Sequence, residues 1–106
     1  MTDEEREQLR AGLIQAGFWG ADESGDPTTN GNDAEILQNR MLKRLRESIT
    51  MVPMGPFGDE PHRFHIFVND SMFNFRLASG EELPDAICRA ALELPTFLER
   101  HLECRA

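Results

Sequence analysis

Apolar and polar residues alternate along two neighbouring stretches of the chain, residues 64–69 and 73–77. Alternation with a period of two places each apolar set on one face of a β-strand. Asp70 and Ser71, between the stretches, are residue types whose side chains suit a tight turn. The pattern therefore predicts an antiparallel hairpin with one apolar face.

The register of this hairpin follows from keeping its apolar residues together, because a slip of one residue turns a whole strand over. The pairs that satisfy this condition are Val68 with Phe73, Ile66 with Phe75, and Phe64 with Leu77. Such pairing requires a loop with an even number of residues, either Asp70-Ser71 or Asn69 to Met72. Phe67 is the exception, since it falls on the polar face.

Two segments before the hairpin have the apolar spacing of amphipathic helices. The first is predicted over residues 3–16, begins at a capping box on Thr2 and ends at Gly17. The second is predicted over residues 33–49, with a capping box on Asn32. Its stripe contains Ala34, Leu37, Met41, Leu42, Leu45 and Ile49, and Ile36 lies outside it. Residues 48–52 could instead form a short strand, which would make a third strand at 49–52.

A third helical stripe follows the hairpin and consists of Leu83, Ile87, Ala90, Ala91 and Leu94. Pro84 suits the first turn of this helix, where its missing N–H is not needed. Pro95 is expected to end the helix, and Thr96 would then cap a new short helix over residues 97–104. One kinked helix is the alternative, because the later apolar residues stay in phase with the stripe.

Two segments have the composition of loops. Residues 20–32 contain Gly, Asp, Ser, Pro, Thr and Asn, and we expect a mobile loop that could tether the first helix. Residues 53–61 contain three prolines and two glycines, so they form neither a helix nor an inner strand. Met54 and Phe57 in this segment either close the edge of the core or form a contact surface for a partner.

These elements predict a single α+β domain over residues 1–106, in which the hairpin is covered by the second and third helices. Residues 83–92, which read LPDAICRAAL after two strands, resemble the LPxAICRAAL stretch of small uncharacterised bacterial and phage-type α-β-α sandwich proteins. The resemblance covers the last third of the chain. It implies an α+β fold and carries no activity or site residues.

The charge of the chain limits its function. The formal net charge is −8, which does not favour binding to a phosphate backbone. No apolar run approaches the roughly 20 residues that span a bilayer. The acidic start, residues 1–7, differs from a secretory or mitochondrial targeting segment, so we expect a cytoplasmic protein without membrane contact.

Candidate metal and thiol sites are incomplete in the sequence. Residues 26–37 partly match a calcium-binding loop, but the twelfth position is Leu37 instead of a glutamate. His101 and Cys104 are three residues apart on a helix, and no spacing supplies further zinc ligands. Cys88 and Cys104 form no CxxC motif and are expected to be reduced thiols, although a disulfide between them stays open.

Candidate catalytic and basic sites are equally sparse. No GxSxG, HExxH, P-loop or GxGxxG motif occurs. Cys88 could pair with His65, but it falls near the buried side of its helix. The one basic run consists of Arg40, Lys43, Arg44 and Arg46. We interpret it as a solvated face, and the alternative is a binding site for nucleic acid or for an acidic partner.

The sequence therefore predicts no catalytic, cofactor or metal site and leaves the function open between three classes. The favoured class is a small acidic accessory protein that binds a protein partner or a second copy of itself. The candidate surfaces are the first helix, the loop with Met54 and Phe57, and the basic face from Arg40 to Arg46. A small-molecule binder or minor enzyme is the second class, with a pocket lined by His65 and Arg76. An acidic nucleic-acid-associated or DNA-mimicking protein is the third.

Overall fold

The computed structural model describes residues 2–45, 50–55, 63–70 and 73–102. These residues form three α-helices and a three-stranded antiparallel sheet, which confirms the α+β prediction. In chain order the elements are α1 (Asp3–Gln15), α2 (Gly31–Leu42), β1 (Thr50–Met54), β2 (Phe64–Asp70), β3 (Phe73–Gly80) and α3 (Leu83–Phe97), followed by the π-helical turn η1 (Leu98–Leu102). No helix among them is both long enough and apolar enough to span a bilayer.

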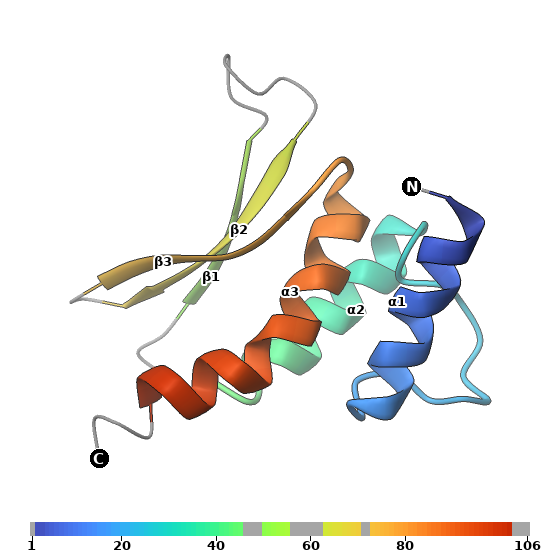
Figure 1. Ribbon diagram of the computed structural model, residues 1–106, viewed down its shortest axis with the longest axis horizontal. Helices are drawn as coiled ribbons and strands as arrows, with labels where there is room; N and C mark the ends of the chain where they lie inside the picture. Colours follow the sequence, from blue (N-terminus) through green and yellow to red (C-terminus); the bar gives the residue numbers. More distant parts are fainter. Residues whose placement is uncertain (1, 46–49, 56–62, 71–72, 103–106) are drawn as a thin grey trace.

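Helix α3 is the centre of the molecule. It packs against β3 and β2, and α1 and α2 pack against α3, which lies between them and the sheet in Figure 1. Its residues are buried around most of its circumference: Asp85, Ala86, Ile87, Cys88, Ala90, Ala91, Leu94 and Phe97. The small side chains of Ala86, Ala90 and Ala91 allow the sheet on one side and α1 and α2 on the other to pack closely against α3. The expectation that α2 and α3 would cover the hairpin together needs correction, because α2 packs mainly on α3.

Helix α1 forms as its sequence predicts. The Thr2 hydroxyl accepts a hydrogen bond from the Glu5 backbone N–H at 3.2 Å and so satisfies one open donor of the first turn. Gly17 has a φ of +82°, a left-handed conformation that ends the helix. Leu9 and Leu13 are buried in the core with α3, so the loop that follows α1 does not hold it apart as a tether.

Helix α2 differs from its prediction at both ends. Its N-cap is Asn30 and not Asn32: the Asn30 side chain accepts from the backbone N–H groups of Asn32 and Asp33 at 2.9 and 3.2 Å. The predicted box on Asn32 does not form, because the helix begins before it, at Gly31. The Asp33 carboxylate accepts from the Asp26 N–H at 2.9 Å in the preceding turn. The helix ends at Leu42, and residues 46–49 of the predicted helix lie outside the described residues. Ile36 is exposed, as predicted.

The predicted third strand is confirmed as β1, and β2 lies between β1 and β3. The predicted hairpin register is wrong by two residues, since Val68 opposes Phe75 and Asp70 opposes Phe73. The loop has an even number of residues, 71–72, which lie outside the described residues. The pairing then shifts between Ile66 and Phe67, where β3 accommodates one extra residue, Leu77.

Pro95 lies inside α3, so the predicted break at this residue is wrong. An interior proline costs a helix about 3 kcal/mol because it removes one backbone hydrogen bond and crowds the preceding turn. Leu94 and Phe97 are both buried on the stripe that faces the core. Each buried side chain of this size contributes about 2 kcal/mol, which offsets the cost of the proline. The C-terminal part of the predicted 97–104 helix lies outside the described residues.

The segment between α1 and α2 contributes to the core. Pro27 and Thr28 are buried, and the Asp26 carboxylate accepts from the Thr28 backbone N–H at 3.0 Å. These contacts explain how a polar segment takes a defined path beside α3. Its predicted mobility stays a prediction.

Candidate functional site

The sheet has one face toward α3 and an opposite face that no described helix covers. The register of the three strands assigns alternate residues to this second surface, which we call the outer face. Its members are Thr50, Val52, Met54, His65, Phe67, Asn69, Asn74, Arg76 and Ser79.

Apolar side chains lie at the middle of the outer face. Val52 is 36% exposed and Met54 is 39% exposed, while Phe67 beside them is half-buried. Met54 was expected either to close the edge of the core or to form a contact surface, and its exposure contradicts the first of these. Phe57, the second residue of that expectation, lies outside the described residues.

The outer face carries little charge. Among its members Arg76 alone has a side chain of fixed charge, whereas 28% of all residues in the chain are charged. Arg63, which precedes β2, lines a pocket together with Ser79 at one end of the face. Arg76 is exposed, and its side chain forms no ion pair within the described ranges. The outer face is therefore a nearly neutral, partly apolar surface with one cation at its border.

His65 and Ser79 form a polar pair on the outer face. The imidazole Nδ1 lies 2.7 Å from the Ser79 hydroxyl oxygen, and His65 is only 3% exposed. The extra residue in β3 completes this pairing, because the register of Phe67 with Arg76 would otherwise place His65 opposite Ala78. No local sequence signal marks this shift, so the pair is not predictable from the sequence. A hydroxyl bonded to an imidazole can become a nucleophile, but here the bond also satisfies two polar groups where the ring is buried.

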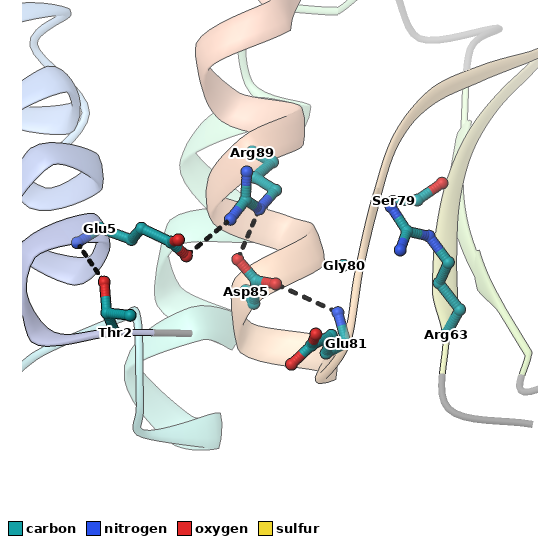
Figure 2. A pocket seen from close by; sticks show the side chains of 8 residues that line it. All are labelled: Thr2, Glu5, Arg63, Ser79, Gly80, Glu81, Asp85 and Arg89. Carbon is teal, nitrogen blue, oxygen red and sulfur yellow. Dashed lines mark hydrogen bonds and ion pairs between the residues drawn. The ribbon is translucent and has the colours of Figure 1, made fainter.

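A surface pocket of about 260 Å³ lies where α1, α3 and the start of β2 meet. Figure 2 shows Thr2, Glu5, Asp85 and Arg89 on the helical side and Arg63 and Ser79 on the side of the sheet, with Gly80 and Glu81 between them. Neither His65 nor Arg76, which the sequence placed in a pocket, lines this one.

The polar groups of the pocket are used to join β3 to α3. The buried Asp85 carboxylate accepts from Arg89 Nε at 2.7 Å and from the Glu81 backbone N–H at 3.1 Å. Arg89 Nη2 also lies 3.9 Å from a Glu5 oxygen (Figure 2). A Cβ atom on Gly80 would lie 2.5 Å from Asp85 Oδ2, so this approach requires glycine. The polar groups of the pocket thus have a structural role, which is to hold the end of β3 against the start of α3.

The structure does not bring Cys88 and His65 together as a nucleophile and base. The Cys88 thiol is fully buried and donates to the Pro27 carbonyl oxygen at 3.3 Å, whereas His65 bonds Ser79. Burial raises the pKa of Cys88 to about 12, and the nearby Asp85 and Asp26 add to this effect. The thiol is thus protonated at neutral pH. Cys104, its predicted disulfide alternative, lies outside the described residues.

The other candidate metal and calcium residues have local roles where they are described. Burial disfavours ionisation of Asp26, but hydrogen bonds from Thr28 outweigh it and lower the Asp26 pKa. Leu37, at the twelfth position of the partial calcium motif, is buried in the core. Within the described ranges no three His, Cys, Asp or Glu side chains cluster as metal ligands, and the pair His101–Cys104 lies beyond the side chains described.

Two members of the basic run, Arg40 and Arg44, also make contacts with the turn after α1, which adds a structural role to the predicted solvated face. The Arg40 guanidinium lies over the Trp19 ring at 4.8 Å and donates to both Glu23 carboxylate oxygens. Its hydrogen bond lowers the pKa of Glu23 to about 2. Arg44 lies over the Phe18 ring at 3.9 Å.

Of the remaining members of the basic run, Lys43 is exposed and Arg46 lies outside the described residues. The aromatic partners of Arg40 and Arg44 were not predictable from local pattern, because they come from the turn after α1, far back in the chain.

Comparisons of the chain with family models, with curated proteins and with solved structures find no match. The resemblance of residues 83–92 to phage-type sandwich proteins stays a prediction.

Proposed function

We propose that this protein acts by binding another protein through the outer face of its sheet and that it is not an enzyme. The observation that supports this function best is the exposure of Val52 and Met54 beside Phe67 on a face with a single fixed charge. The centres of protein interfaces are depleted of charged residues and enriched in aromatic residues, Met and Arg. The outer face contains a residue of each of these kinds, Phe67, Met54 and Arg76.

The arrangement of the outer face also suits a protein partner. Val52 and Phe67 lie in the middle row of the outer face, and the uncharged row Thr50, Asn69 and Asn74 borders them on one side. An apolar centre with a polar rim is the usual anatomy of a protein-binding surface. The side chains of the rim can form hydrogen bonds with a partner without the cost of removing a charge from water.

The remaining polar clusters give less support to catalysis. In the pocket of Figure 2, Asp85 is bonded to Arg89 and to the backbone of Glu81. The Cys88 thiol is protonated and buried. These groups have structural partners where a catalytic group would need access to a substrate.

A photo-crosslinking experiment tests the proposed function. A benzophenone amino acid replaces Val52 on the outer face, and in a matched protein it replaces Ile36, which is 43% exposed on α2. In cells that produce the protein, we expect discrete protein adducts from position 52 and none of the same mass from position 36. Met54→Asp should remove the adducts from position 52, because it places a charge in the apolar centre.

The controls separate binding from unfolding. Each variant should retain the circular dichroism spectrum and melting temperature of the parent protein, since the substituted side chains are exposed. Identical adducts from positions 52 and 36, or adducts that survive Met54→Asp, would overturn the outer face as the binding surface.

A further inference from the structure

Arg76 can orient a partner on the outer face, because it offers a charged contact that the apolar residues of the face do not provide. We propose that the partner contacts this face with an apolar segment that carries a carboxylate, which pairs with Arg76. This inference rests on the proposed function and specifies the chemistry of the partner. Its support comes from the position of Arg76 in the sheet and from the distribution of charge in the chain.

Arg76 belongs to one row that crosses the sheet. Val52 on β1 opposes Phe67 on β2, and Phe67 opposes Arg76 on β3. Neighbouring strands lie about 4.8 Å apart, so the row from Val52 to Arg76 spans roughly 10 Å. A short peptide segment can cover this distance. Its apolar side chains would then pack on Val52 and Phe67 while an acidic side chain reaches Arg76.

The charge of the chain favours a carboxylate at this place and disfavours it elsewhere. The chain has a net charge of −8, yet the outer face contains no acidic residue among its assigned members. An acidic segment would be repelled by most of the surface and attracted at Arg76, which orients the complex. A guanidinium also binds a carboxylate through two parallel hydrogen bonds, which strengthen as an apolar contact excludes water.

Single-stranded nucleic acid is the competing ligand for such a face. Phe67 beside Arg76 could stack a base on the open sheet. Nucleic-acid binding draws most of its affinity from several phosphate contacts, and the outer face offers Arg76, with Arg63 beside one end, on an acidic protein. The charge balance therefore favours a peptide.

A displayed peptide library selected on the full-length folded chain tests this chemistry. We expect the wild-type protein to enrich peptides that combine apolar residues with Asp or Glu, and Arg76→Glu to enrich peptides with Lys or Arg instead. The acidic peptides should bind Arg76→Glu at least about tenfold more weakly, the effect of one lost hydrogen-bonded charge pair. Lys43→Glu is the matched control, because it makes the same charge change at an exposed position after α2.

The outcomes distinguish the inference from the function on which it rests. Peptides that require Val52 but have no acidic preference and bind Arg76→Glu equally well would overturn the carboxylate and leave the outer face intact. Peptides that bind Val52→Asp as well as the wild type would overturn the outer face itself. Binding of labelled oligothymidine that is lost in Arg76→Glu would identify the competing ligand and also overturn the inference.

Discussion

The two faces of the sheet are built from alternate residues of the same strands but have different environments. Val68 faces α3 and is fully buried, while Val52 lies on the outer face and is 36% exposed. The residue type is the same, so the difference comes from the surroundings: Val68 lies on the central strand toward α3, whereas Val52 lies on an edge strand and on the face that no described helix covers. An apolar residue in a strand thus indicates the core only when its neighbours on the same face are also covered. The apolar residues of the outer face are the more informative set.

The largest expected contrast concerns thiol reactivity. With a pKa of about 12 in place of the ordinary 9.0, Cys88 should carry about a thousandfold less thiolate at pH 8 than an unperturbed thiol. A cysteine introduced by Val52→Cys on the outer face is the matched exposed thiol. We expect iodoacetamide to modify Cys88 at least a thousandfold more slowly than the new thiol, measured by peptide mass mapping.

The same pKa shift has a consequence for stability. The unfolded thiol ionises above its ordinary pKa of 9.0, whereas the folded thiol keeps its proton to about 12. The contribution of the protonated Cys88 thiol to the stability of the fold is therefore complete below pH 9 and decreases as the pH rises toward 12. Equal alkylation rates for the two thiols in the folded protein would contradict the closed interior beside α3.

The second contrast compares two valines on opposite faces. Val68→Ala should lower the free energy of unfolding by about 2 to 3 kcal/mol, because it removes buried methyl groups and leaves a cavity. Val52→Ala should change it by less than about 0.5 kcal/mol, as is usual for a surface substitution. Urea denaturation of both variants measures the difference. Comparable losses would show that the outer face is covered in the folded monomer.

The smallest contrast concerns two adjacent residues at the end of β3. Gly80→Ala should cost about 1 to 3 kcal/mol, since the new methyl group would overlap Asp85 and the Ala86 backbone nitrogen. Ser79→Ala removes only the hydrogen bond to His65 and should cost about 1 kcal/mol. Thermal melts of both variants provide the measurement. A larger loss for Ser79→Ala would assign the His65–Ser79 pair a greater structural role than the junction with α3.

The sequence predicts those elements whose signals are local. Thr2 and Gly17 mark both ends of α1 because a cap and a left-handed stop depend on only a few neighbouring residues. The alternation of β2 and β3 indicates a hairpin for the same reason. The N-cap of α2 was misplaced by two residues because Asn30 and Asn32 are equally suitable as caps, and the pattern of residues does not decide between them.

Features that depend on distant residues were not predictable from pattern. The register shift beside Ile66 leaves Leu77 as an extra residue that is buried in the core, and it creates the His65–Ser79 pair. Pro95 stays inside a helix because tertiary burial outweighs its local preference. The candidate surface is an intermediate case, since Met54 was recognised as a surplus apolar residue although its exposure required the structure.

The central position of α3 has a consequence for how the chain matures during translation. Both the sheet and the pair α1–α2 pack against this helix, yet ribosomes synthesise it after all of them. The earlier segments therefore leave the exit tunnel with apolar stripes that have no surface to bury them. Stable folding should begin only once the stripe from Ile87 to Phe97 has emerged, and a nascent chain stalled before that point should be sensitive to protease and prone to chaperone capture.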